Sequence, residues 1–335
     1  MNHAIVVENL TKVYGRPGSG LLAVDQINFE VQQGEIFGFL GPNGAGKTTT
    51  QRMLTTLLQP TKGRIFINGH DLAHDAYPAK RMIGLVPEES NVYTELTAWD
   101  NLMFTASLYR VPRDQGAERA QQLLETFGLW EKRHVKTMNF SKGMRRRLSI
   151  GMAIIHKPAL LFLDEPTPGL DAQSARAIQD LIRQLNAEGT TVFLTTHQIE
   201  EANQLCDRVA IINHGKIATI DTPERLKRTF QRVQSFEVSL EPDGQVHGQA
   251  LTVLPGVTNS VKVGDKWRLY TEQPAALLPL IMDYAAAHKL QVVSLNTMVP
   301  SLEDVFLEIT GGQVGAIRHK PHNNQPRQRG KGARQ

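Results

Sequence analysis

The stretch from Gly41 to Thr48, GPNGAGKT, limits the possible folds of this chain more than any other. It fits the pattern G-x-x-x-x-G-K-[ST], directly after the apolar run Glu35–Leu40 and before RMLTTLL, which has helical character. In this context the glycines let backbone N–H groups turn inward around an anion, and the helix N-terminus adds partial positive charge. A plain glycine-rich turn is the alternative, but the strand–loop–helix order favours a nucleoside triphosphate site in an α/β fold. Lys47 is expected to reach the β- and γ-phosphates, and the Thr48 hydroxyl to bind Mg²⁺.

Two further apolar runs end in side chains that suit such a site. LLFLDEP places Asp164 and Glu165 at the end of a buried strand, and TVFLTTH ends in His197. Because ligands of open α/β sheets bind at the carboxyl ends of the strands, we expect Asp164 to hold Mg²⁺, directly or through water, and Glu165 to polarise the attacking water. Alone, an acidic pair is more often a turn or a helix cap, and a single histidine is usually structural. Beside a phosphate loop, a γ-phosphate contact by His197 is favoured.

Residues 140–149, FSKGMRRRLS, combine a helix start with a concentration of positive charge. Ser141 suits an N-cap, and the helix after it has an apolar stripe formed by Met144, Leu148, Met152 and Ile155. The helix dipole disfavours the cations of the first turn, which are Lys142, Arg145 and Arg146. Such a start is typical of a phosphate-binding helix end. Because residues 41–48 already supply one phosphate loop, we interpret this end as serving a nucleotide held by a second copy of the chain, and we assign the arginines no catalytic role.

The pattern along the chain predicts two folded units, as the length of 335 residues suggests. The first is expected over 1–230, with strands at AIVVENL, Leu21–Phe29 and RIFINGHDL, a helical region of about 88–157 with helices near 98–109, 114–127 and 144–155, a helix near 172–186 and a hairpin at His214–Gly215. The second, over 232–312, has short strands at SFEVSL, LTVL, SVKV, KWRLYT and QVVSLN and helices at Ala276–His288 and SLEDVFLEIT. It is typical of a small α+β domain.

Charge and cysteine content exclude several classes of protein. Residues 313–335 contain six Lys and Arg side chains and no acid, and removing six cations from the net charge of +4 leaves −2 on the rest. The basic balance is therefore poor evidence for nucleic-acid binding by the folded part. Cys206 is the single cysteine, so an intrachain disulfide and a four-cysteine zinc site are excluded. A signal-peptide pattern and a run of about 18 apolar residues are both missing, which favours a cytosolic protein or one peripheral to a membrane.

Together these motifs resemble those of the nucleotide-binding subunits of ATP-binding cassette (ABC) transporters. GPNGAGKT is similar to the Walker A loop, FSKGM to the signature sequence, LLFLDEP to Walker B and TTHQ to the switch-histidine segment. Tyr14 in LTKVYG looks like the aromatic residue that stacks on adenine, and Asp171 in PGLD like the D-loop residue. The resemblance covers residues 4–230. It implies an α/β P-loop ATPase with a RecA-like core, an antiparallel β subdomain and a helical subdomain.

The resemblance also implies an ATPase that uses ATP and Mg²⁺ and whose chains close head to tail over two nucleotides. Each site would take Lys47, Glu165 and His197 as catalytic residues from one chain. The residues implied in nucleotide binding are Tyr14, Gly41, Pro42, Asn43, Gly44, Ala45, Gly46, Lys47, Thr48, Thr49, Glu88 and Asp171, with Ser141 and Gly143 from the other chain. The residues implied in metal binding are Thr48, Asp164 and Glu88.

The second unit closes with PSLEDVFLEITG and is similar to that of exporter ATPases of the daunorubicin-resistance type, whose permease is a separate chain. This implies a multidrug-efflux subunit at the cytoplasmic face of a bacterial or archaeal membrane, where ATP hydrolysis switches the permease between inward- and outward-facing states. One alternative is an importer ATPase, against which the second unit argues. Another is a soluble ABC ATPase acting on a ribosome or nucleic acid, although the chain has neither the second cassette nor the long coiled coil usual there. The tail 313–335 is expected to be disordered and solvated, or else to contact anionic lipid.

The chain departs from the family pattern at two places. Lys142 and Met144 stand where Gly and Gln are common, whereas Ser141 and Gly143 are kept. Glu88, in LVPEES, stands where the Q-loop glutamine is usual. A glutamate can ligate Mg²⁺ but adds negative charge close to the γ-phosphate. The change is either family variation without effect or a change in metal dependence or in coupling to the permease.

Overall fold

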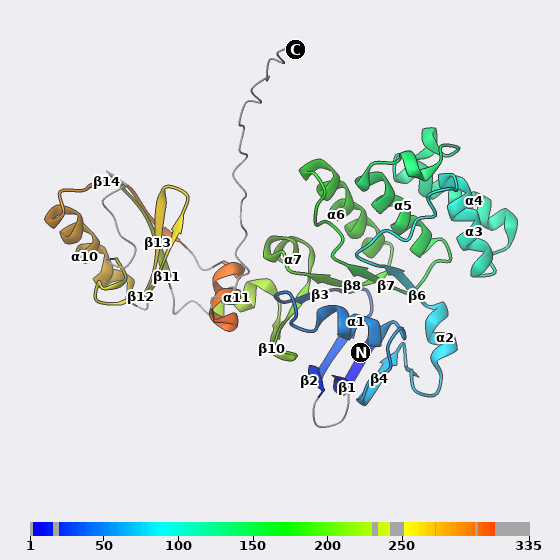
Figure 1. Cartoon of the computed structure of the whole chain (residues 1–335), viewed down its shortest axis with the longest axis horizontal. Coiled ribbons are helices and arrows are strands. Elements are labelled where there is room, and N and C mark those ends of the chain that lie inside the picture. Colours follow the sequence, from blue (N-terminus) through cyan, green and yellow to red (C-terminus); the bar gives the residue numbers. More distant parts are fainter. Residues whose placement is uncertain are drawn as a thin grey trace, which may run out of the picture.

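The computed structural model describes residues 3–15, 20–229, 234–241, 251–271, 273–298 and 301–311 (Figure 1). In these residues the strands form three sheets. Two of the sheets belong to the part of the chain that carries the predicted nucleotide motifs, and the third lies in the C-terminal unit. The expected tail over 313–335 lies outside the described residues.

The central sheet carries the buried strands predicted around the phosphate loop. Its order is β10-β9-β3-β8-β7-β6. The strands are β3 (Ile36–Leu40), β6 (Ile83–Val86), β7 (Leu160–Asp164), β8 (Thr191–Thr196), β9 (Arg208–Asn213) and β10 (Lys216–Asp221). Neighbours from β9 to β6 are parallel, and β10 is antiparallel to β9. Because β3, β7 and β8 run in the same direction, the loop, the carboxylates and the histidine that follow them lie along one edge of the sheet.

The second sheet is antiparallel and holds the N-terminal strands against the phosphate loop. Its order is β2-β1-β4-β5, formed by β1 (His3–Tyr14), β2 (Leu21–Gln32), β4 (Lys62–Ile67) and β5 (His70–Asp71). Helices α1 (Lys47–Leu54) and α2 (Ala76–Arg81) belong to the same part of the chain. A group of rings joins the two sheets, with centroids 5.4–6.2 Å apart, made by Phe29, Phe37, Phe39, Phe162 and Phe193. This shared core fixes β1 and β2 relative to the loop after β3.

A helical region lies between β6 and β7. It contains α3 (Ala98–Leu108), α4 (Arg113–Thr126) and α5 (Lys142–Ile154) with 3₁₀ turns at Trp130–Lys132 and Thr137–Asn139. The three helices pack on one another, and their buried faces continue into a cluster that includes α6 (Ala172–Ala187) and α7 (Ile199–Leu205). The helices predicted near 98–109, 114–127, 144–155 and 172–186 are therefore confirmed, each within two residues at both ends.

Several elements differ from the sequence patterns. Strand β6 and helices α2 and α7 were not indicated by them. The strand predicted at LTVL is wrong, because Leu251 and Thr252 are helical and Val253 lies in a turn. Leu251 is fully buried while Val253 is 81% exposed, and the Leu254 N–H donates back to the Leu251 C=O at 3.3 Å. These contacts curl the segment, so that it cannot pair as an extended strand.

The C-terminal unit has its own antiparallel sheet of order β12-β13-β11-β14. Its elements are β11 (Gln234–Glu241), β12 (Val257–Val263), β13 (Lys266–Thr271), α10 (Pro274–Ala287) and β14 (Gln291–Met298). Helix α10 packs on β11 and β14, and the two layers enclose a separate apolar core that includes Phe236, Leu269 and Leu277.

The last described helix, α11 (Leu302–Thr310), packs on the first part of the chain. It begins in a capping box, in which the Asp304 N–H donates to Ser301 Oγ at 3.2 Å and the Ser301 N–H to Asp304 Oδ2 at 2.7 Å. Figure 1 shows α11 beside α7, and it also contacts α8 (Pro223–Thr229). Its buried side chains join the cluster of the helical region, and they are Leu302, Val305 and Phe306. The division into two units at 230–232 stays a prediction. Helix α11, which this division assigns to the second unit, packs on the core of the first unit.

Candidate functional site

The carboxyl edge of the central sheet borders a cavity of about 340 Å³. Its lining comes from β1, β2, the loop after β3, the segment after β6 and the ends of β7 and β8. The lining residues are Tyr14, Leu21, Ala23, Pro42, Asn43, Gly44, Gly46, Lys47, Thr48, Thr49, Glu88, Glu165 and His197. Most of the predicted nucleotide residues are therefore brought together at one place.

Two glycines allow the loop over 41–48 to pass close to its neighbours. Gly46 has a φ of 108°, and a Cβ there would lie 2.7 Å from the Ala23 carbonyl oxygen. A Cβ on Gly41 would lie 2.5 Å from the Ile212 carbonyl oxygen. Ala45, inside the loop, is buried, and its N–H donates to the Pro42 C=O at 3.2 Å. Since α1 starts at Lys47 with no acidic residue in its first turn, the helix dipole favours an anion in the cavity.

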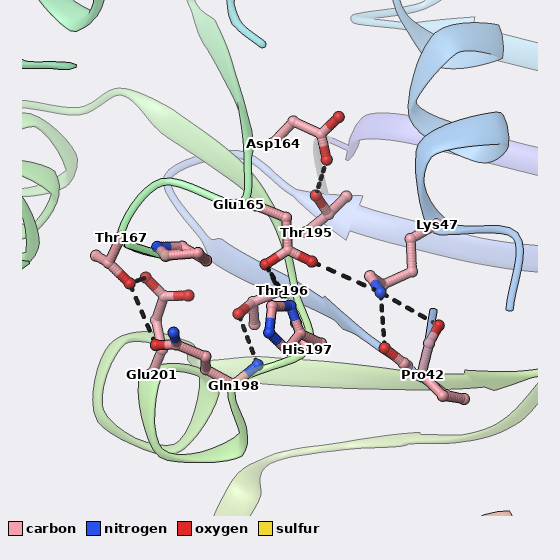
Figure 2. A network of polar contacts seen from close by, with 12 residues as sticks. Pro42, Lys47, Asp164, Glu165, Thr167, Thr195, Thr196, His197, Gln198 and Glu201 are labelled. Atoms are coloured by element: carbon pink, nitrogen blue, oxygen red, sulfur yellow. Dashed lines mark hydrogen bonds and ion pairs between the residues drawn. The ribbon is translucent and has the colours of Figure 1, made fainter. Parts of the chain in front are cut away.

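Lys47 points its ammonium group into this loop. The side chain is buried, and Nζ donates to the carbonyls of Gly41 at 2.7 Å and Pro42 at 3.3 Å. Nζ also lies 3.6 Å from Glu165 Oε1 (Figure 2). Burial lowers the pKa of Lys47, and the charges of Glu165 and Asp164 oppose that change. Neutral carbonyls are weaker partners than a phosphate oxygen, so the ammonium group is placed to exchange them for an anion.

Asp164 is the last residue of β7 and is tied to the neighbouring strand. Its Oδ1 accepts from Thr195 Oγ1 on β8 at 2.5 Å (Figure 2). Burial raises the pKa of Asp164, and the hydrogen bond from Thr195 opposes the rise. The sequence patterns did not single out Thr195, because a threonine inside TVFLTTH looks like any other strand residue.

Glu165 lies between Lys47 and His197. While Oε1 faces Lys47, Oε2 is 2.9 Å from His197 Nδ1. This hydrogen bond raises the pKa of His197 above 6.5, against the effect of burial. The φ of Glu165 is 47°, a left-handed conformation that costs a residue other than glycine about 1–3 kcal/mol. The structure around Glu165 must therefore hold its backbone in place, and this conformation directs the carboxylate into the cavity.

Tyr14 and Glu88 line the same cavity from two different segments of the chain. Tyr14 ends β1 and is 37% exposed, and its hydroxyl lies 3.4 Å from Thr49 Oγ1. An exposed ring at a cavity wall can stack on a base. Glu88 follows β6 by two residues and lines the cavity together with Glu165. Its position became clear only with β6, the strand that the sequence patterns did not indicate.

The residues predicted to face a second nucleotide lie elsewhere. Ser141 caps α5 through its Oγ, which accepts from the Met144 N–H at 3.2 Å, and it is exposed. Gly143 is packed so closely that a Cβ would lie 2.7 Å from Ser174 Oγ. Asp171 caps α6 and accepts from both the N–H and the hydroxyl of Ser174, which lowers the pKa of Asp171. Of the described residues that line the Lys47 cavity, none belongs to α5 or α6.

A buried carboxylate behind the site gave no signal in the sequence. Glu201 on α7 is 2% exposed and its Oε1 accepts from Thr167 Oγ1 at 2.8 Å (Figure 2). Burial raises the pKa of Glu201. The contact ties the loop after β7 to the helix after His197, but IEEA has the composition of any acidic helix start.

Among the described residues, no helix has both the length and the apolar character needed to cross a bilayer.

Known proteins share both parts of this architecture. The ABC transporter family matches residues 24–168, and the DrrA1-3-like C-terminal domain of ATP-binding proteins matches residues 222–310. The linearmycin resistance ATP-binding protein LnrL of Bacillus subtilis is 37% identical over 307 residues, which cover 91% of this chain and 97% of that protein. A fluoroquinolones export ATP-binding protein of Mycobacterium tuberculosis is 38% identical over 313 residues, which cover 92% of this chain and 94% of that protein.

A solved structure with the same fold has 26% sequence identity and a TM-score of 0.60, and the match covers 65% of this chain and 98% of that one. It is a dimeric post-hydrolysis state of an ATP-binding cassette bound to ADP and Pi. The predicted ATPase fold is thereby confirmed. The fold, the motifs and these relatives together show that this chain belongs to the ABC transporter family. Within the family it is an ATP-hydrolysing subunit of the drug-resistance exporter type, with a daunorubicin-resistance-like C-terminal domain.

Proposed function

We propose that two copies of this protein close head to tail around two ATP molecules and that hydrolysis drives a separate membrane permease. One observation carries the proposal. The chain has two helix starts suited to phosphate, at Lys47 and at Ser141, and in the part of the chain that the structure describes they do not line one cavity. The dimeric state of the related ATP-binding cassette supports the same arrangement. In the closed pair, Ser141 and Gly143 of one copy complete the site around Lys47 of the other, beside Asp171.

The contacts of the cavity suggest how each side chain works. Lys47 exchanges the carbonyls of Gly41 and Pro42 for the β- and γ-phosphates. Glu165 accepts a proton from the attacking water, because its carboxylate already faces the cavity and is oriented by His197. Since Nδ1 of His197 is engaged by Glu165, Nε2 is the atom left to contact the γ-phosphate. Tyr14 stacks on the adenine at the cavity wall.

The donor set of the cavity fits Mg²⁺. The Thr48 hydroxyl and the Glu88 carboxyl line it, and Asp164 stands directly before Glu165. These are oxygen ligands, and proteins usually hold Mg²⁺ with one or two carboxylates plus substrate phosphates. When bound, the ion neutralises charge on the phosphates.

Glu88 distinguishes this chain from the usual family pattern. We propose that its carboxylate changes the Mg²⁺ dependence of ATP hydrolysis, because it lines the cavity with Lys47 and Glu165. ATPase activity measured against Mg²⁺ concentration should differ between the parent protein and Glu88→Gln. Superimposable curves would mean that the substitution has no effect on metal use.

The names of the relatives suggest where the protein acts and what it helps to transport. By analogy with proteins named for linearmycin resistance and fluoroquinolone export, the protein would sit at the cytoplasmic face of the membrane and power export of drug-like molecules. Co-purification with a multi-spanning permease is expected, and recovery with ribosomes or nucleic acid instead would contradict it. The six cations of 313–335 would add lipid binding, at about 1 kcal/mol for each cation near an anionic surface. Deleting the tail should then weaken binding to anionic vesicles.

Glu165→Gln provides the main test. The variant keeps the shape of the side chain but cannot accept the proton, so it should bind ATP, form a stable dimer on size-exclusion chromatography with ATP and Mg²⁺, and turn over slowly. Turnover at the parent rate would remove Glu165 as the base. Trapped ATP without dimerisation would reject the head-to-tail arrangement.

A further inference from the structure

Arg146 on α5 is buried, with 6% of its surface exposed. Its guanidinium group donates to five main-chain carbonyls. Nε donates to Pro166 at 3.0 Å, Nη2 to Asp164 at 2.6 Å and to Glu165 at 2.8 Å, and Nη1 to Pro87 and Glu88. In the described part of the chain, all hydrogen bonds of this guanidinium group end on the main chain. Arg146 can therefore fix the conformation of the main-chain segments whose carbonyls it binds.

The five carbonyls belong to the two segments that present carboxylates to the cavity. Three of them are consecutive and bracket Glu165, the residue with a φ of 47°. The other two belong to Pro87 and to Glu88 itself, in the segment after β6. One guanidinium group thus connects the chain around Glu165 with the chain around Glu88.

The charge and shape of the group suit this position. Burial lowers the pKa of Arg146, and the negative charges of Asp164, Glu201, Glu88 and Glu165 oppose that effect; a guanidinium group stays protonated in proteins. Its planar set of five N–H donors can meet acceptors on several sides at once. A lysine has three donors on a single atom and cannot satisfy five carbonyls in two segments.

We propose that Arg146 is a positioning residue for ATP hydrolysis, which fixes the backbone of Glu165 and Glu88 to helix α5. The inference rests on the proposed role of Glu165 as the base. It also extends it, because α5 is the helix that Ser141 caps. Arg146 thereby fixes the position of Glu165, the proposed base, relative to the Ser141 end of α5, the proposed contact to the second nucleotide.

Arg147 offers a matched control one residue away. It is half-buried on the same helix, and its Nη1 donates to the Phe127 carbonyl at 2.7 Å, inside the helical region. A lysine at either position keeps the charge and loses the planar donor set. Arg147→Lys therefore measures the general cost of this exchange on α5, away from Glu165 and Glu88.

The test compares Arg146→Lys with Arg147→Lys in the full chain. Misplacing a catalytic group by about 1 Å can lower a rate by about 100-fold, and we expect a loss of kcat of this order for Arg146→Lys. The KM for ATP should change by less than about threefold, because the Lys47 loop has none of these contacts. Arg147→Lys should keep the parent kcat even if its melting temperature falls. A parent-like kcat for Arg146→Lys, or an equal loss of kcat in both variants, overturns the proposal.

A double-mutant cycle separates positioning from general stability. If Arg146 acts through Glu165, Arg146→Lys should slow the residual hydrolysis of Glu165→Gln little or not at all. A multiplicative loss in the double variant contradicts the proposal. So does loss of fluorescent ATP-analogue binding by both Arg146→Lys and Arg146→Gln, since Arg146 would then serve the fold. Full turnover by Glu165→Gln would instead refute the assignment of the base, whatever Arg146 does.

Discussion

Thr195→Val probes how the fold stabilises the buried carboxylate of Asp164. Thr195 is fully buried and Asp164 is 7% exposed, and the hydroxyl of Thr195 donates to Asp164 Oδ1 at 2.5 Å. Valine has nearly the same shape but no donor, so Oδ1 loses this partner without a cavity forming. A hydrogen bond to a charged group contributes about 1.5–3 kcal/mol. We expect the free energy of unfolding of the nucleotide-free protein to fall by this amount at neutral pH.

The size of this loss should depend on pH. Burial raises the pKa of Asp164 above 3.8, and the bond from Thr195 holds it down. With a raised pKa, the folded protein binds the proton more tightly than the unfolded chain, so the free energy of unfolding falls as pH rises from the unfolded pKa through the folded one. Removing Thr195 raises the folded pKa further. The variant should therefore lose little stability in acid, where Asp164 is protonated, and most at neutral pH.

Urea unfolding in the presence of a chelator measures this difference at both pH values. Thr191→Val is the matched control, because Thr191 is buried on the same strand and its Oγ1 accepts from the Gly34 N–H at 2.9 Å. Neither partner there is charged, so its loss of about 1 kcal/mol should not change with pH. An equal loss for Thr195→Val in acid and at neutral pH would refute the reasoning, as would a loss no larger than that of the control.

Three other substitutions test separate parts of the structure. Gly46→Ala should cost about 1–3 kcal/mol and weaken binding of a fluorescent ATP analogue, because a Cβ would meet the Ala23 carbonyl. Gly34→Ala, where a Cβ would have no atom of the described residues within 4 Å, should leave binding unchanged. Phe306→Ala should lower the free energy of unfolding by about 3–5 kcal/mol. Urea unfolding followed by tryptophan fluorescence should show a lower midpoint, because Trp99 and Trp130 pack against the same core as Phe306. An unchanged midpoint would mean that α11 does not stabilise this core. The hydrogen bond to Glu165 raises the pKa of His197. The protonated His197–Glu165 pair therefore stabilises the fold fully below pH 6.5, and this stabilisation is lost as the pH rises through the folded pKa of His197. The stability difference between the parent and His197→Gln should therefore shrink with rising pH, and a constant difference would exclude that ion pair.

The phosphate loop and its strands could be predicted because one motif fixes both the backbone conformation of the loop and its position between a strand and a helix. A buried strand, a glycine turn and a helix start leave few other arrangements, and the carboxylates and histidine follow strands that run in the same direction. The helices over residues 98–155 were predictable for a similar reason, since their apolar faces repeat at the helical period. In each case a local pattern was enough.

Other parts of the site depend on packing that no local pattern contains. Three arginines follow one another at 145–147 and the sequence does not distinguish them. Only the position of α5 beside the segments that follow β6 and β7 buries Arg146 against carbonyls. The position of Glu88 required β6, a four-residue edge strand beside a helical region. For α11 the helix and its capping box were visible in the sequence, whereas its apolar side chains do not indicate which of the two cores they join.

The contact between α8 and α11 has a consequence for the topology of the C-terminal unit. Because these helices touch, the described elements β11 to β14 are preceded and followed in the chain by helices that lie next to each other. Segments whose two ends lie close together can be removed or replaced with little effect on the rest of a domain. Bridging 229 to 301 with a short linker would keep α11 in place. Ending the chain at 229 would instead remove α11, whose buried side chains belong to the same apolar cluster as Leu205 and Leu226. We therefore expect this truncation to destabilise the protein more than the bridged deletion does.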